Sequence, residues 1–100
     1  MSMRGVTRLL WWLLSGTTGG FNRGRILEEL FKQPQNANEL AKSLDMDYKT
    51  VRHHLKVLRK NNLITTMGSG YGTTYFPSDL LEDNKDKFLE IWDKIGKKQK

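Results

Sequence analysis

The chain contains no cysteine and only two prolines in 100 residues. Without thiols it has no disulfide framework, no thiolate metal site and no cysteine nucleophile, and it suits a reducing, cytoplasmic setting. Long apolar runs are missing too. The strongest run, Leu9 to Leu14, has six residues, whereas a membrane-spanning helix needs about 20 and a secretory signal about 7–15.

Acidic residues are also scarce relative to basic ones. Asp and Glu number 11 against 17 Lys and Arg, which gives a formal net charge of +6. In a small domain this balance favours an anionic partner, either a nucleic acid or an acidic membrane surface. With 100 residues, 37% of them hydrophobic, the chain is long enough for one domain with a small core.

The first third of the chain predicts two helices. Apolar residues at helical spacing indicate an amphipathic helix from Arg4 to Ser15, and a Gly/Thr-rich connector follows it to Gly20. Asn22 is placed to cap a second helix over residues 23–32, which Pro34 would stop.

The middle of the chain predicts a short helix, a tight turn and a basic helix. Asn36 and Glu39 have the spacing of a capping box in front of the short helix, and Asp47 can cap the next one. That helix, Tyr48 to Asn61, carries a narrow apolar stripe and five basic residues with no acid between them. The basic residues are Lys49, Arg52, Lys56, Arg59 and Lys60.

Two strand-like segments, 63–67 and 72–76, follow and predict a β-hairpin. Ser78 can cap a last helix from Asp79 to Ile95, and a basic tail ends the chain. The predicted fold class is therefore mainly α with a small β-hairpin: a winged helix-turn-helix with extra N- and C-terminal helices.

At this point the sequence resembles a known family. The segment NANELAKSLDMDYKTVRHHLKVLRKNNLI is similar to the helix-turn-helix core of ArsR-like winged-helix transcriptional regulators. The segments TGGFNRGRIL and GYGTTYFPS resemble the archaeal branch of that group. The resemblance implies a homodimeric regulator that places one recognition helix per subunit in the major groove of double-stranded DNA.

Two departures limit what the resemblance implies. Metal-sensing members use cysteine thiolates, which this chain lacks, so neither a metal nor another cofactor is expected. The wing, residues 63–78, carries no charge, so its phosphate contacts would come from Ser69, Tyr71 and backbone amides.

The residues expected to contact DNA follow from helical geometry and from the resemblance. On the basic helix, one side faces away from the apolar stripe and fits a major groove about 12 Å wide. The resemblance adds Thr50 as a phosphate contact near the start of this helix. Arg23, at the N-terminus of the helix predicted over residues 23–32, adds another. The expected set is Tyr48, Lys49, Thr50, Arg52, His53, Lys56, Arg23, Ser69 and Tyr71.

No catalytic or metal site is predicted, and we expect the chain not to be an enzyme. His53 and His54 are adjacent on a helix and cannot share one metal ion. His54 is expected to be a half-buried packing residue and His53 a donor near DNA. The glycines of residues 68–72 lie between strands and lack the lysine of a phosphate-binding loop, so they indicate a hairpin turn.

The two terminal helices need something to cover their apolar residues. They can cover one another within a monomer, or pack across the two-fold axis of a homodimer, which we expect because so small a chain has little core of its own. The expected interface residues are Leu9, Leu10, Leu13, Leu14, Leu81, Phe88, Trp92 and Ile95. The organisation is then an N-terminal helix and connector (1–20), a DNA-binding domain (21–78) and a dimerisation helix with basic tail (79–100).

Two other functions remain open. The uncharged wing is compatible with a winged-helix protein-interaction module that does not bind DNA. A membrane-surface regulator is the lesser alternative, because Trp11 and Trp12 lie beside basic and leucine residues within residues 4–15.

Overall fold

The computed structural model describes residues 3–98, which form six α-helices and a three-stranded sheet. The helices are α1 (Met3–Ser15), α2 (Gly20–Lys32), α3 (Ala37–Leu44), α4 (Tyr48–Lys60), α5 (Asp79–Asp83) and α6 (Lys85–Lys98). The strands are β1 (Gln35–Asn36), β2 (Ile64–Met67) and β3 (Thr74–Pro77), with a short 3₁₀ turn, Gly70–Gly72, between β2 and β3.

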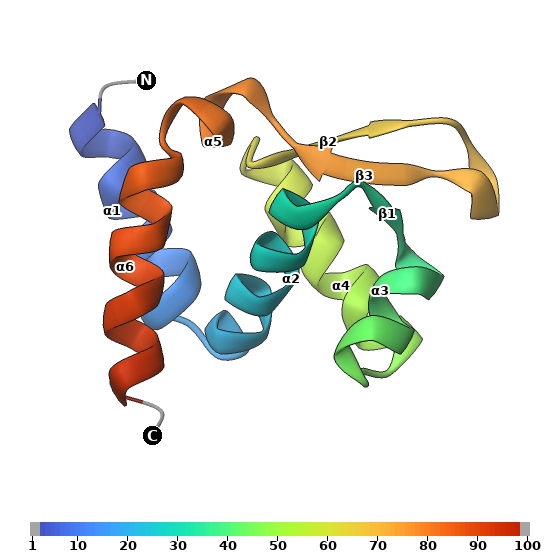
Figure 1. The fold of residues 1–100 in the computed structure, drawn as a ribbon, viewed down its shortest axis with the longest axis horizontal. Helices are drawn as coiled ribbons and strands as arrows, with labels where there is room; N and C mark the ends of the chain where they lie inside the picture. Colours follow the sequence, from blue (N-terminus) through green and yellow to red (C-terminus); the bar gives the residue numbers. More distant parts are fainter. Residues whose placement is uncertain (1–2, 99–100) are drawn as a thin grey trace.

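Helix α2 lies at the centre of the molecule. It contacts α1 on one side and α3, α4 and β3 on the other. Helices α1 and α6 lie side by side at one end, and α3, α4 and the sheet lie at the other (Figure 1). The hairpin of β2 and β3 extends away from the helices as a wing. This arrangement confirms the predicted winged helix-turn-helix with additional terminal helices.

The sheet has one strand more than the sequence predicts. Its order is β1-β3-β2 and both pairs are antiparallel. In the hairpin, Ile64 pairs with Pro77 and Met67 with Thr74, while Gln35 of β1 pairs with Tyr75 on the other edge. A two-residue strand has no alternating pattern to recognise, which is why β1 was not predicted.

The predicted caps form at three helices. Asn36 and Glu39 make the complete capping box of α3. The side chain of Asp47 accepts a hydrogen bond from the Thr50 amide at 3.2 Å, and Ser78 caps α5 in the same way. These bonds satisfy amide groups that the first turn of a helix leaves without partners.

The prediction that Asn22 caps the second helix is wrong. Helix α2 begins at Gly20, and its N-cap is Gly19, at a left-handed φ of 83°. A Cβ at Gly19 would lie 2.7 Å from Cε1 of His54. A residue without a side chain therefore lets the connector turn tightly against α4 and start α2 earlier.

The single helix predicted over 79–95 is two helices. Helix α5 ends at Asp83, Asn84 follows it, and α6 begins at Lys85. The Asn84 side chain donates to the Leu80 carbonyl at 2.8 Å, and its own carbonyl accepts from the Phe88 amide at 3.1 Å. The break coincides with Lys85, a polar residue at a position where the apolar pattern of the predicted helix would place an apolar one.

The predicted dimer-interface residues are largely buried inside one chain. Six of the eight are at most 5% exposed: Leu10, Leu13, Leu14, Leu81, Phe88 and Ile95. Helix α1 packs on both α2 and α6, so the terminal helices cover one another within the protomer. Only Leu9 and Trp92 of the predicted set remain partly exposed. The assignment of those six residues to an intermolecular interface is therefore wrong; Lys100, in the predicted basic tail, lies outside the described residues.

The same packing removes the leucine face on which membrane attachment through residues 4–15 depended. Leu10, Leu13 and Leu14 face the protein core. Among residues 3–98, no helix combines the length and apolar character needed to cross a membrane.

Candidate nucleic-acid interface

Helix α4 has one buried side and one exposed side. Val51, Leu55 and Leu58 are at most 1% exposed and pack into the core. Apart from His54, which is buried, and Val57, which is partly buried, the remaining positions face solvent because a period of 3.6 residues places them on the opposite side. The exposed residues are Lys49, Thr50, Arg52, His53, Lys56, Arg59 and Lys60, with Tyr48 partly exposed at the start of the helix. The structure thus brings six of the predicted contact residues together on one face, which we call the basic face.

Within the part of the chain that the structure describes, the cations of the basic face have no acidic partners. The ion pairs found within residues 3–98 join Lys32 to Glu29, and Lys87 and Lys94 to Glu90, on α2 and α6. Arg59 donates instead to the Thr66 hydroxyl and Arg52 to the Tyr48 hydroxyl, at 3.3 Å. The positive charge therefore faces solvent unneutralised, and an anionic ligand can bind it without displacing an internal ion pair.

The wing extends this surface beyond the helix. A shallow groove of about 390 Å³ runs along α4 between Lys49, Arg52, Lys56 and Arg59, with Tyr75 of β3 at its side. The groove lies on the face where a recognition helix would meet the edges of base pairs.

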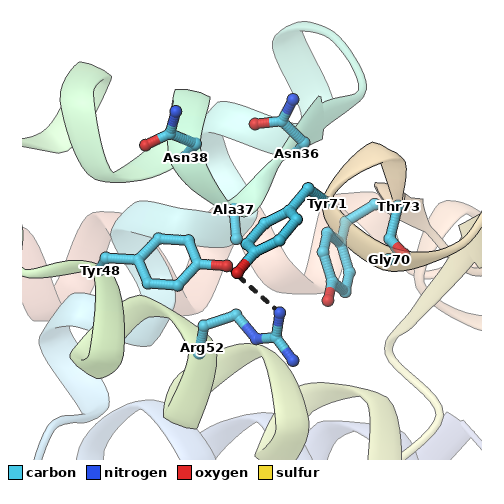
Figure 2. A pocket seen from close by; sticks show the side chains of 9 residues that line it. Asn36, Ala37, Asn38, Tyr48, Arg52, Gly70, Tyr71 and Thr73 are labelled. Carbon is cyan, nitrogen blue, oxygen red and sulfur yellow. Dashed lines mark hydrogen bonds between the residues drawn. The ribbon is translucent and has the colours of Figure 1, made fainter.

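A second hollow lies where α3, α4 and the wing meet. Figure 2 shows Tyr48, Arg52 and Tyr71 around this cavity of about 430 Å³, with the hydrogen bond between Arg52 and Tyr48 drawn as a dashed line. The guanidinium carbon of Arg52 is 6.0 Å from the centre of the Tyr48 ring. The hydrogen bond that Arg52 donates to the Tyr48 hydroxyl raises the pKa of Arg52, which favours the charged guanidinium.

The wing tip presents polar and aromatic groups without charge. Ser69 is exposed, and the Tyr71 ring is 91% exposed on a turn flanked by glycines. Because Tyr71 lines the same cavity as Tyr48 and Arg52, the tip of the wing lies next to the start of α4. Tyr71 is thus accessible to a ligand lying on the basic face, and Ser69 is exposed on the same turn of the wing.

Arg23 does not belong to this surface, and its prediction as a phosphate contact is not supported. Its side chain is 4% exposed and points into the protein. Its Nε donates to the Leu13 carbonyl at 3.0 Å and its Nη2 to the Thr17 hydroxyl and the Thr18 carbonyl. Its Nη1 lies 3.2 Å from Nδ1 of His54. Arg23 thus joins the end of α1 and the connector to the back of α4.

His54 completes this buried contact, and it is more deeply buried than the half-buried packing residue that the sequence predicts. It is 5% exposed, whereas His53 is exposed on the basic face. A guanidinium can only donate, so Nδ1 of His54 accepts and the ring proton lies on Nε2. Burial, followed by the charges of Arg23 and His53, lowers the pKa of His54 below its usual value. Within the described residues no cluster of His, Asp and Glu could hold a metal ion.

Tyr75 is the site residue that the sequence analysis missed. It is 8% exposed in β3, yet it lines both the groove along α4 and the cavity at its start. Its position in the second strand of the hairpin was predicted. Which face of that strand meets α4 was not, because register depends on pairing with both β1 and β2.

Comparison with known proteins agrees with this geometry. Residues 22–66 match the sequence model described as "Bacterial regulatory protein, arsR family". This segment contains β1, α3 and α4, with most of α2 and of β2. No curated protein matches the chain.

Several solved structures share the fold at low sequence identity. MarR of Staphylococcus aureus, solved with salicylate and kanamycin, is 21% identical with a TM-score of 0.65; the match covers 96% of this chain but 65% of MarR. The homodimeric winged helix-turn-helix DNA-binding domain Mb0332 of Mycobacterium bovis, a possible ArsR-family regulator, is 20% identical with a TM-score of 0.65, over 91% of this chain and 83% of that one. S. aureus MepR bound to an oligodeoxyribonucleotide is 18% identical with a TM-score of 0.64, over 97% and 72% of the two chains.

The family match and the fold point to the same class. The matched model is of a bacterial family, and no finding tests the archaeal branch, which stays a prediction. Residues 22–66 thus match the sequence model of the arsR family, and the architecture of the chain is that of a winged helix-turn-helix protein.

Proposed function

We propose that this protein is a transcriptional regulator that binds double-stranded DNA sequence-specifically through α4 in the major groove. The observation that carries the proposal is the basic face: exposed cations along one helix, with no acid paired to them. A helix surface that only needed to be soluble would mix both signs of charge.

The position of each side chain supports a separate role in this proposal. Arg52 and Lys49, on the first turns of α4, are placed to reach base edges, and a guanidinium can donate two hydrogen bonds to guanine. Lys56, Arg59 and Lys60 lie further along the helix and meet phosphates. Asp47 already occupies the Thr50 amide, so Thr50 offers its hydroxyl to a phosphate.

We also propose that the protein acts as a cytoplasmic homodimer, as the M. bovis relative is a homodimer. Residues 21–78 would bind DNA, and the terminal segments 1–20 and 79–100 would form the interface. Because the inner faces of α1 and α6 are buried, the interface would use their outer faces, where Trp12 is 55% and Leu89 is 45% exposed. Two α4 helices would then enter half-sites about 34 Å apart.

The DNA test compares Arg52→Ala with Lys60→Ala. Arg52→Ala should weaken binding to a selected site by about 1–3 kcal/mol and relax base preference. Lys60→Ala should weaken all duplexes alike and reduce the salt dependence. Lys94→Ala is the matched control, since it removes an exposed lysine of α6. Helix α6 lies at the end of the molecule away from α4 (Figure 1). Selection from a random duplex pool supplies the site and reports its length and symmetry.

Specific outcomes would overturn the proposal. If Arg52→Ala and Lys60→Ala lose affinity equally on all sequences, α4 does not read bases. If micromolar protein shifts no duplex at low salt, the protein-interaction module becomes the better reading. Sedimentation of Leu89→Glu against the unmodified chain tests the dimer: a monomer is expected only for the variant.

Regulators of this class are usually not enzymes, and we propose no catalytic activity for this protein. The acids of α5 and α6 are spread along exposed helix faces, where they serve solubility.

A further inference from the structure

A buried pair of side chains joins α4 to α1 and to the connector that follows α1. Nδ1 of His54, on the buried side of α4, lies 3.2 Å from Nη1 of Arg23. Arg23 also donates to the Leu13 carbonyl at 3.0 Å and to the hydroxyl of Thr17 in the connector. His54 is 5% and Arg23 is 4% exposed. We call this pair the Arg23–His54 junction, and it lies outside the surface proposed to contact DNA.

The connector confines the His54 ring on a further side. A Cβ added at Gly19 would lie 2.7 Å from Cε1 and 3.4 Å from Nε2 of this ring, so the backbone of Gly19 lies directly against it. The same point is 3.6 Å from Nη1 of Arg23. Ring, guanidinium and connector are thus packed together, and a ring that moves toward the connector must displace it.

The junction accommodates one positive charge, that of Arg23. A neutral His54 accepts from Arg23 at Nδ1, whereas a protonated ring carries hydrogen on both nitrogens and can only donate. Protonation would therefore remove the hydrogen bond and leave two positive groups facing one another.

The groups around the ring do not offset a second charge. The titratable group beside it on α4 is His53, whose ring centre is 5.6 Å away and which is itself positive when protonated. Arg23 is the charged group that faces it from α2. The ion pairs within residues 3–98 involve neither Arg23 nor His54, so no carboxylate there is paired with either.

These surroundings make the closed junction resist protonation. Burial, followed by the charges of Arg23 and His53, lowers the pKa of His54 below its usual value of 6.5. In an opened junction water solvates the ring, and its pKa returns toward that value. The open form therefore binds a proton more readily than the closed form, and opening becomes easier as the pH falls below about 6.5.

We propose that protonation of His54 opens the Arg23–His54 junction and thereby weakens the binding of DNA. The same helix carries His54 and the basic face, so loss of the junction loosens α4 against α2 and the connector. Its contacts with α3 and β2 remain, so the helix stays folded but is held less firmly in the orientation that a duplex requires. The effect on DNA rests on the proposed function, whereas the opening of the junction does not.

The adjacent histidine predicts the opposite response and supplies a matched control. His53 is exposed on the basic face, and its protonation adds a positive charge where phosphates would bind. Acid should therefore strengthen DNA binding through His53 and weaken it through His54. Substitution of each histidine in turn separates the two effects.

The first experiment follows the junction without DNA. The ¹⁵N-labelled full chain is titrated from about pH 8 to about pH 4 at constant ionic strength, while NMR records the His54 ring and the amides of residues 17–20. The connector amides should shift with the same midpoint as the His54 ring. The shifts should persist in His53→Gln and be lost in His54→Gln and His54→Asn. Both His54 variants keep a neutral acceptor that cannot be protonated, so one suffices if the other fails to fold.

Three results of this titration would overturn the proposal. The His54 ring titrates while the connector amides stay in place, or it does not titrate within this range. In the third, far-UV circular dichroism shows that the whole chain unfolds before the ring titrates, so the opening is not local.

The second experiment measures the affinity for a selected duplex between about pH 7.5 and pH 5.5 at constant ionic strength. In His53→Gln, affinity should fall with pH by up to about tenfold per pH unit and protomer, the limit for release of DNA on uptake of one proton. The double variant His53→Gln/His54→Gln should lose this fall and provides the baseline for all other titrating groups. In His54→Gln, affinity should not fall below that baseline.

The outcomes separate the two halves of the proposal. Equal pH profiles of His53→Gln and the double variant, with the junction opening in the first experiment, would overturn the effect on DNA. A junction that opens in a chain that binds no duplex at any pH would instead refute the proposed function and leave the acid-sensitive junction standing.

Discussion

Replacing Arg23 by methionine removes a buried guanidinium while keeping an unbranched side chain that fills much of the same space. In the folded chain, Arg23 donates to the carbonyls of Leu13 and Thr18 at 3.0 and 3.3 Å, and also to the Thr17 hydroxyl. Its fourth contact is to Nδ1 of His54, at 3.2 Å. The variant therefore tests whether this buried side chain holds α1 and α4 together.

The expected loss follows from which acceptors are left without a partner. Thr17 and Thr18 lie in a connector that is partly or fully exposed, so water can replace the guanidinium there. The Leu13 carbonyl and His54 Nδ1 lie in buried residues, and each unpaired buried acceptor costs about 1–3 kcal/mol. Relief of the buried charge offsets part of this sum, which leaves a loss of about 2–4 kcal/mol.

Urea unfolding followed by far-UV circular dichroism measures this loss, and the melting temperature should fall by about 10–25 °C. Lys32→Met is the control, since it removes an exposed cation from the same helix. A double-mutant cycle with His54→Phe should show coupling of about 1 kcal/mol or more. The reasoning is refuted if Arg23→Met costs less than about 0.5 kcal/mol, or if the two substitutions add independently.

Three further predictions concern caps, packing and pH. Asp47→Ala should lower the free energy of unfolding by about 1 kcal/mol, because the Thr50 amide loses its acceptor; the urea midpoint reports it. Gly24→Ala should be strongly destabilising and change the near-UV spectrum, since the new Cβ would lie 2.2 Å from the Trp92 ring. Burial lowers the pKa of His54 in the folded chain, so the unfolded chain binds the proton more readily. Stability should therefore be full well above pH 6.5, the ordinary pKa of histidine, and fall as pH drops through it; urea titrations should show a weaker dependence for His54→Gln.

Local patterns explain what the sequence predicted well. The capping box of Asn36 and Glu39 and the cap at Asp47 depend on residues three positions apart, so the sequence alone contains the whole signal. The exposed side of α4 follows from the spacing of Val51, Leu55 and Leu58, which fixes one face as buried. The residues of the basic face could therefore be predicted from the sequence alone.

Arg23 shows where charge misled the prediction. Its positive charge near a helix start suggested a phosphate contact. Yet position 23 precedes Ile26, Leu27 and Leu30 by three, four and seven residues, which is the spacing of one helix face. The periodicity thus placed Arg23 on the buried side of α2. Only the tertiary structure shows that the backbone carbonyls of Leu13 and of the connector accept hydrogen bonds from Arg23 there.

The terminal helices show a different limit. Their leucines must pack against another apolar surface. The sequence allowed two such surfaces: the other terminal helix of the same chain, or that of a second copy. Apolar periodicity identifies the buried face of a helix, but it does not identify the surface that packs against this face. The contact of α1 with α6 inside the protomer resolves the choice for the inner faces and leaves Trp12 and Leu89 outside.

The contacts that attach α4 to the rest of the protein also affect the electric field of its basic face. Behind this helix, Arg23 donates to backbone carbonyls, a hydroxyl and a neutral imidazole, and no carboxylate of the described residues is among these partners. A buried acid at this position would have satisfied the guanidinium more strongly, but its negative charge would lie beneath Lys49, Lys56 and their neighbours and weaken the field that they direct outward. Neutral acceptors hold the helix while leaving that field intact. The same choice makes the contact sensitive to acid, since a protonated His54 can no longer accept from Arg23.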